Sequence, residues 1–239
     1  MNLKRKPLSA AALAGGKSSR MGTDKALLPL SEGGPSMLAL VLHTLSAVAD
    51  EVFVVANDRE RYGQFGVPVV PDLYPDSGAL GGIHAAIQHS THEHCLVVAC
   101  DMPFLNIDLL RNMAYESRDY DVLVPLVPGQ SRQRGDGLVF QTLHAIYGKR
   151  CVSLIEERIS GGNRQVVGFF EDARVRTISV AEITRWDPSL RSLFNANTPH
   201  ALSMAAELSK TVELDHGSGR FRRKELPTNR QRTARIRKL

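Results

Sequence analysis

The stretch Leu13-Ala14-Gly15-Gly16-Lys17-Ser18-Ser19-Arg20-Met21-Gly22-Thr23-Asp24-Lys25 decides the fold, because it joins an apolar run to a glycine-rich loop. The apolar run covers residues 8–14 and predicts a first strand that is buried on both faces. Glycine lets a backbone approach a ligand closely and present N–H groups to a phosphate. The loop also carries three cations (Lys17, Arg20 and Lys25), which suit a polyphosphate better than a neutral ligand.

Two common phosphate-binding motifs do not fit this loop. Gly16-Lys17-Ser18 matches the end of a Walker A loop, but Ala11 stands where that motif requires its first glycine. The dinucleotide fingerprint G-x-G-x-x-G is also absent. The structural alternative is a tight turn between a strand and a helix, with cations that only face solvent.

Apolar runs and helical patterns alternate through the first half of the chain. We expect strands over residues 51–56, 67–70, 95–100 and 121–125, and helices over 36–49, 78–89 and 107–116. This alternation predicts a single Rossmann-like α/β domain, with a mostly parallel sheet flanked by helices. Ligands in such folds bind beyond the carboxyl ends of the strands, where Gly15, Asn57, Asp72 and Asp101 are expected.

The second half of the chain is less regular. Strand-like residues occupy 138–147 and 174–180, and helices are expected over 151–159, 163–172 and 200–208. Residues 193–199 look like the end of a strand and a turn. A single folded domain over residues 1–209 accounts for these elements.

Charge separates the end of the chain from the rest. Residues 210–239 hold ten Lys or Arg and three acidic residues, a net charge of +7, so the chain's total of +5 leaves −2 for residues 1–209. We expect a basic, disordered C-terminal tail. It has no aromatic interleaving, so nucleic-acid binding is not expected, although RNA or an acidic protein is the alternative partner.

The remaining composition favours a cytoplasmic protein. No apolar run is long enough to cross a bilayer, and the basic start of the chain is better explained by the first strand than by a secretion signal. The three cysteines have no disulfide or metal spacing, which predicts reduced thiols. His89, His92, His94 and Cys95 fit no closed zinc set and are interpreted as a solvated loop.

Asp101 is the best candidate for a magnesium ligand. It directly follows the strongest apolar run, and Mg²⁺ takes one or two carboxylates and completes its shell with phosphate oxygens and water. The alternative is a helix cap or turn residue. Asp72 follows the third expected strand. Two roles stay open for it: it accepts hydrogen bonds from a base or ribose, or it is only a turn residue. Asn57 is a weaker candidate, because Asn is common in turns.

Five motifs occur in the order typical of one family: L-A-G-G…R-M-G…D-K, an Asp after strand three, G-x-L-x-G, C-D-x-P and N-x-N-T-P. They lie here at residues 13–25, 72, 78–82, 100–103 and 195–199. Over about residues 8–209 the chain therefore resembles the molybdenum cofactor guanylyltransferases, which have the nucleotide-diphospho-sugar-transferase fold. The resemblance implies that GTP contacts Leu13, Ala14, Gly15, Lys25, Asp72 and Asp101, that Asp101 also binds Mg²⁺, and that Asn195 and Asn197 lie near the pterin or the metal.

The resemblance implies a reaction in which GMP passes from GTP to molybdopterin, with maturation proteins of molybdoenzymes as further partners. Amides at Gly15 and Gly16 would hold the triphosphate, and Arg20, Lys25 and Asp101 would carry catalysis. Two alternatives stay open: cytidylyl or other nucleotidyl transfer to a small phosphate, and a GTP-binding delivery protein without catalysis. The chain departs from the family at Gln141-Thr142, where a Pro is usual, and at His200, where an acid is usual.

Overall fold

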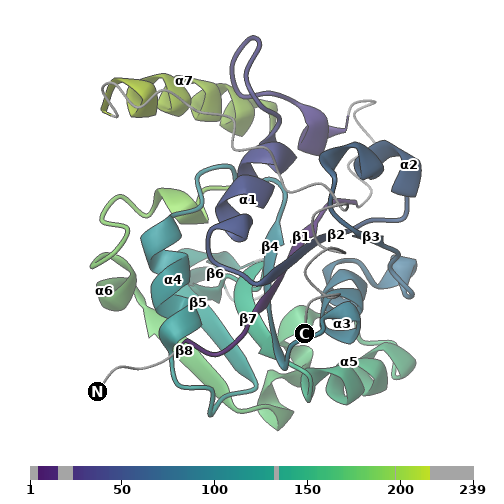
Figure 1. Cartoon of the computed structure of the whole chain (residues 1–239). Coiled ribbons are helices and arrows are strands. Elements are labelled where there is room, and N and C mark those ends of the chain that lie inside the picture. The colour runs from purple at the N-terminus through teal and green to yellow at the C-terminus, as the bar shows by residue number, and fades with distance from the viewer. Residues whose placement is uncertain (1–4, 16–23, 132–134, 197, 216–239) are drawn as a thin grey trace, which may run out of the picture.

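A computed structural model describes residues 5–15, 24–131, 135–196 and 198–215, and its centre is an eight-stranded sheet (Figure 1). The strand order is β3-β2-β1-β4-β7-β5-β6, and β8 pairs with β5. The strands are β1 (Ser9–Leu13), β2 (Glu51–Val55), β3 (Val69–Val70), β4 (His94–Ala99), β5 (Val122–Ser131), β6 (Gly135–Phe140), β7 (His144–Gly148) and β8 (Val175–Ser179).

The sheet has a parallel half and a mixed half. β1 pairs in parallel with both β2 and β4, and β2 pairs in parallel with β3. β7 is antiparallel to β4 and to β5, so β5 and its parallel partner β8 run in the direction of β4. Among the described strands only β7 and β6 run the opposite way. The predicted α/β class with a mostly parallel sheet is confirmed.

Helices cover both faces of the sheet, as alternation along β1 requires. Ala10 and Ala12 face one apolar cluster, which contains side chains of α1 and α4, whereas Ala11 faces a second, which contains side chains of α3 and α5. The helices are α1 (Met37–Ser46), α2 (Arg59–Tyr62), α3 (Ala79–His89), α4 (Ile107–Tyr115), α5 (Cys151–Ser160), α6 (Val180–Ile183) and α7 (Pro199–Asp215). None of these described helices has the length and apolarity that a bilayer crossing requires.

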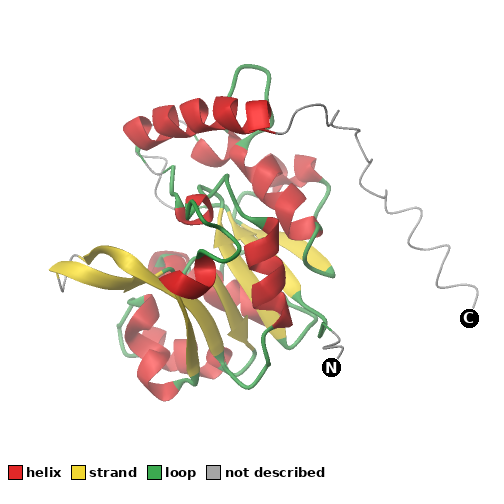
Figure 2. Ribbon diagram, turned by 90° about the vertical axis from the view of Figure 1, so that its left-hand side faces the viewer, coloured by secondary structure: helices red, strands yellow, loops and turns green. Residues whose placement is uncertain are grey.

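The second half differs from the expected elements in several places. β5 extends to Ser131 and forms a hairpin with β6 that projects from the body (Figure 2). The helix expected over 163–172 is a 3₁₀ helix, Val166–Asp172. The strand expected at 193–199 was wrong: a 3₁₀ helix, Arg191–Leu193, leads into a loop there, and Phe194 packs against Phe104 with ring centroids 6.1 Å apart. Ala196 in this loop is buried, and Phe194 is partly buried, by packing and not by a strand ladder.

The last helix crosses the expected end of the folded domain. α7 runs to Asp215, whereas the sequence pattern predicted an end near residue 208. Residues 216–239 lie outside the described part of the chain, so the division at residue 209 stays a prediction.

One lysine closes the C-terminal end of α3. Lys149 Nζ donates to the carbonyl oxygens of Ile87 at 2.8 Å and Ser90 at 2.5 Å, and lies 3.4 Å from that of Gln88. The last carbonyl groups of a helix have no partner within it, and a cation there also interacts favourably with the helix dipole. Lys149 therefore fixes α3, whose other end lies at the edge of the sheet described below.

We expect Lys149→Met to lower the free energy of unfolding by about 2 kcal/mol, because it leaves these carbonyls without a charged donor while keeping most of the apolar stem. Urea unfolding at pH 7 measures the change. Lys6→Met is the matched control, because Lys6 is exposed and makes no hydrogen bond or ion pair in the described structure. Equal stability of Lys149→Met and wild type would show that water replaces the lysine at no cost.

Candidate active site

Four candidate residues lie along one edge of the parallel half-sheet. Asp72 follows β3, Asn57 follows β2, Gly15 follows β1 and Asp101 follows β4. Since these strands are neighbours and run in parallel, their carboxyl ends share an edge. The edge therefore presents two carboxylates, an amide and a glycine turn in the order Asp72, Asn57, Gly15, Asp101.

The chain leaves β1 through a backbone conformation that favours glycine. Gly15 has φ +146°, which L side chains rarely adopt. Just before it, the Ala14 N–H donates to the Val55 carbonyl at 3.0 Å, and the Leu13 carbonyl accepts from the Cys100 N–H at 3.1 Å. The sheet thus already uses the carbonyl of Leu13 and the N–H of Ala14.

Asp72 and Asn57 form one hydrogen-bonded unit. The Asn57 side-chain oxygen accepts from the Asp72 N–H at 2.8 Å, and Asp72 Oδ1 accepts from the Tyr74 N–H at 2.7 Å. Burial raises the pKa of the Asp72 carboxyl, whereas the Tyr74 N–H and the charge of His84 lower it. Asn57 therefore sets the backbone that carries Asp72, a role that its strand-end position alone did not reveal.

The first turn of α3 packs closely against this unit. A Cβ added at Gly81 would lie 2.7 and 2.9 Å from the two carboxylate oxygens of Asp72, and one at Gly82 would lie 3.0 Å from Leu13 Cδ1. The two glycines bring the N-terminal end of α3 against the strand ends. The free N–H groups of a helix N-terminus and its dipole favour an anion.

Asp101 has a buried oxygen with no partner. Its Oδ1 is shielded from solvent and makes no hydrogen bond among the described residues, whereas its backbone carbonyl accepts from the Ala196 N–H at 2.8 Å. Burial raises the pKa of the Asp101 carboxyl, although its own backbone N–H and the charge of Lys25 act in the opposite direction. A buried carboxylate oxygen without a donor is costly unless a ligand or cation satisfies it.

A pocket of about 270 Å³ opens beside Asp101, on the side away from Asp72. Four of its lining residues are apolar and four are polar. The described structure gives no hydrogen-bond partner to the side chains of Gln141, Thr142 and Asn195, which line it with Asp101. The other lining residues are Ala99, Met102, Phe140 and Leu143. The pocket can therefore hold a partly apolar molecule that also accepts and donates hydrogen bonds.

Similarity to known proteins agrees with this geometry. A family model described as the MobA-like NTP transferase domain matches residues 10–176. The chain belongs to this family. Its predicted membership of the nucleotidyltransferases is thereby confirmed.

Relatives of this MobA-like chain carry consistent names. A protein of Pelotomaculum thermopropionicum named a probable molybdenum cofactor guanylyltransferase is 39% identical over 202 residues, which cover 83% of this chain and 93% of the relative. A molybdenum cofactor guanylyltransferase of Desulfosudis oleivorans is 32% identical, over 81% and 91% of the two chains. The crystal structure of molybdopterin-guanine dinucleotide biosynthesis protein A from Archaeoglobus fulgidus is 27% identical, with a TM-score of 0.70 over 85% of this chain and 99% of that one.

Three predicted site residues, Gly16, Arg20 and Asn197, lie outside the described residues. The sequence did not identify Tyr62, whose hydroxyl contacts Asp24 of the first loop. No local signal could have found that pair, because it joins positions 38 residues apart.

Histidines at the opposite edge of the sheet form no second site. Ser9 Oγ lies 2.9 Å from His92 Nδ1 and donates to Glu51 at 2.5 Å, which resembles a hydrolase triad. Ser9 is fully buried, however, and the carboxylate contacts the serine instead of the histidine. His94 belongs to β4 and not to the expected loop, whereas Cys95 lies in β4 as predicted. The described residues contain no group of three or more metal-binding side chains.

The unpaired Asp101 carboxylate should cost stability in the ligand-free protein. Because the folded-state pKa is raised, this cost is absent at low pH, where the group is protonated in both states, and it grows as pH rises above the ordinary value of 3.8. We expect Asp101→Asn to raise the free energy of unfolding at pH 7 by about 1 kcal/mol. Urea unfolding at pH 7 and pH 4 checks this; a gain that does not shrink at pH 4, or a loss at pH 7, would contradict it.

Proposed function

We propose that this chain transfers GMP from GTP to molybdopterin, which forms a guanine dinucleotide cofactor and releases pyrophosphate. One observation supports this most directly: the edge of the sheet carries a row of candidate groups from Asp72 to Asp101, and a pocket that Asp101 also lines opens at the end of this row. A transferase for two substrates needs two adjoining sites that meet at the reacting atoms. Because the relatives are named molybdenum cofactor guanylyltransferases, GTP and molybdopterin are the two substrates that we propose.

The nucleotide would lie over the parallel half of the sheet. Base and ribose would lie toward Asp72 and Asn57, and the triphosphate would lie at the Gly15 turn and Lys25. Hydrogen-bond acceptors at Asp72 suit the N–H and O–H groups of a base or ribose. Amides and cations suit phosphate oxygens.

Molybdopterin would occupy the pocket next to Asp101. Its pterin offers amide-like donors and acceptors that match the unpaired side chains of Gln141, Thr142 and Asn195. Apolar residues such as Phe140 and Met102 would cover the ring. Asn197 remains a predicted contact.

The residues present fit a magnesium ion. Asp101 contributes a buried oxygen without a partner, and Mg²⁺ is commonly held by one or two carboxylates together with substrate phosphates. When bound, the ion would neutralise charge on the phosphate oxygens. Other divalent ions with a preference for oxygen would suit the same carboxylate.

The chemistry needs charge neutralisation more than proton transfer. An oxygen of the molybdopterin phosphate forms a bond to the α-phosphorus of GTP, and the bond from that phosphorus to the oxygen bridging to the β-phosphate breaks, so pyrophosphate leaves with the electron pair. The attacking phosphate is already ionised, so no side-chain base is required. Lys25, with Arg20 as predicted, would stabilise the charge that develops on pyrophosphate.

The cellular setting follows from this proposal. A reaction that consumes GTP is expected in the cytoplasm. Molybdoenzyme-maturation proteins stay predicted partners, which would receive the product. Binding of nucleic acid is still not expected.

Pyrophosphate release identifies the substrates. The protein is incubated with Mg²⁺, molybdopterin and either GTP or CTP. Release with GTP supports the proposal, and release with CTP alone would replace it by cytidylyl transfer. Binding of GTP without pyrophosphate release, with molybdopterin present, would favour a delivery protein.

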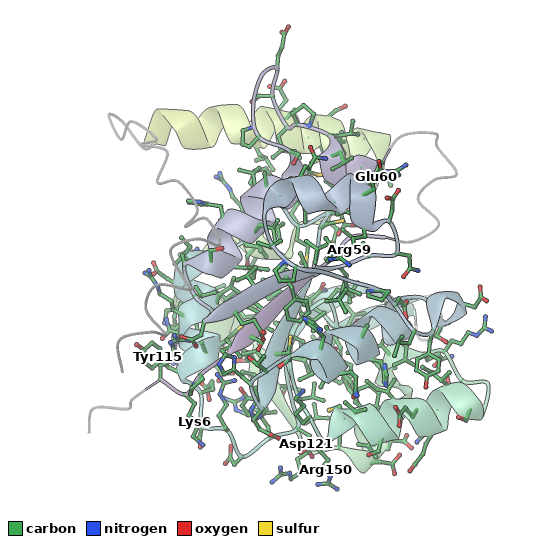
Figure 3. All side chains as sticks on the ribbon, turned by 45° about the vertical axis from the view of Figure 1, so that its right-hand side comes forward. Lys6, Arg59, Glu60, Tyr115, Asp121 and Arg150 are labelled. Carbon is green, nitrogen blue, oxygen red and sulfur yellow. The ribbon has the colours of Figure 1, made fainter. Side chains whose placement is uncertain are left out.

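We expect Lys25→Met and Asp101→Asn each to lower kcat/KM by about 100-fold or more, because Lys25 would face the charge that develops on pyrophosphate and Asp101 would hold the magnesium ion. Initial rates of pyrophosphate release measure the change, and urea unfolding shows that both variants fold. Lys6→Met is the matched control, since Lys6 lies at the other end of the strands and is exposed (Figure 3). A loss of folding in Lys25→Met would count against a catalytic role for this lysine.

A further inference from the structure

We propose that Tyr62 is a positioning residue for the triphosphate: its hydroxyl holds the Asp24 carboxylate so that the phosphates meet Lys25 and not the adjacent acid. This inference rests on the proposed function. It concerns the two residues that end the first glycine-rich loop, and it assigns them opposite tasks. Lys25 attracts the ligand, whereas Asp24 must be prevented from repelling it.

Both oxygens of Asp24 are occupied within the protein. Oδ1 accepts from the Ala26 N–H at 3.1 Å, which caps the 3₁₀ helix Lys25–Leu27. Oδ2 accepts from the Tyr62 hydroxyl at 2.6 Å, and Arg61 Nη1 lies 3.5 Å from the same oxygen. The carboxylate is therefore bound on one side to the start of the helix that carries Lys25 and on the other side to α2.

Tyr62 is well placed to act as the fixed end of this contact. It is 4% exposed and belongs to the apolar cluster beneath α1 and α4, although its neighbours Arg59, Glu60 and Arg61 are exposed. α2 begins after Asp58, whose Oδ1 accepts from the Arg61 N–H at 2.9 Å. Figure 3 shows Arg59 and Glu60 far from Asp121 and Arg150. α2 thus connects the edge of the sheet at the end of β2, where the nucleotide is proposed to bind, to the loop at the end of β1.

The charges explain why such a contact is needed. A free carboxylate one residue before a phosphate-binding lysine would repel the triphosphate and compete for the lysine. Burial and the neighbouring Asp24 raise the pKa of the Tyr62 hydroxyl, so it remains a protonated donor at neutral pH. The Arg61 pair is longer and half-exposed, and such pairs contribute little. Tyr62 is therefore the main restraint on Asp24.

The test compares GTP affinity in four proteins: wild type, Tyr62→Phe, Asp24→Asn and the double variant. Isothermal titration with GTP and Mg²⁺ gives the dissociation constants. We expect Tyr62→Phe to weaken binding about tenfold in the wild-type background, and less than about twofold in the Asp24→Asn background, where no charge has to be held. A role limited to core packing would give the same loss in both backgrounds.

Tyr120→Phe is the matched control. Tyr120 is 3% exposed and its hydroxyl accepts from Arg118 at 2.8 Å, but it precedes β5 at the end of the strands away from the ligand edge. It should bind GTP like wild type while losing a comparable amount of stability in urea. Equal losses of affinity in Tyr120→Phe and Tyr62→Phe would overturn the proposal, as would unchanged binding by Tyr62→Phe.

Two further outcomes separate this inference from the proposed function. Wild type that binds GTP but releases no pyrophosphate with molybdopterin overturns only the transfer reaction, whereas wild type that binds no GTP overturns both. If Tyr62→Phe does not fold, Asp24→Asn alone decides. Affinity equal to or above that of wild type then supports the restraint, and a tenfold or larger loss overturns it, because the carboxylate would itself be a binding group.

Discussion

Parallel pairing of β3, β2, β1 and β4 is the constraint on which the rest of the structure depends. It brings four chain segments that lie far apart in sequence to one edge, and it does so with backbone hydrogen bonds that do not depend on the ligand. Each of these strands is then followed by a different residue at that edge, from Asp72 after β3 to Asp101 after β4. Helix α3 closes the arrangement, since its glycines allow the helix start to approach Asp72 and Leu13.

Three aspartates show how the same side chain is put to different uses. Asp121 is buried at the far end of the sheet, where hydrogen bonds from Arg174 lower its pKa and Arg150 lies 3.4 Å away. Asp24 is held by a tyrosine and a backbone N–H. Asp101 alone among these three has a buried oxygen without a donor. Native proteins seldom leave a buried carboxylate oxygen unpaired, which supports the proposal that a ligand or a cation binds at Asp101.

Much of the parallel half of the sheet, β3-β2-β1-β4, could be predicted from the sequence, because its signals are local. An apolar run fixed each parallel strand to within a few residues, and the residue after each run fixed what the edge presents, as Gly15 and Asp101 show. The mixed half of the sheet and the loops beside it could not be predicted so well. The length of β5 depends on its pairing with β6, and the loop around Phe194 is apolar because it packs on Phe104 and not because it forms a strand. Long-range contacts decide both, and no local pattern encodes them.

The pocket beside Asp101 follows the same logic. Its polar lining comes from the β6–β7 turn, from the residues after β4 and from the loop at Asn195, which the Ala196 N–H ties to the Asp101 carbonyl. A change in any of these segments alters the pocket without disturbing the parallel ladder. Gln141 and Thr142 stand in the turn where the chain departs from the pattern of the family it resembles, and they reach the pocket with uncommitted hydrogen-bonding groups. If the nucleotide binds as proposed, its contacts lie at the ends of paired parallel strands, whereas the proposed acceptor site depends on the turn that carries Gln141 and Thr142.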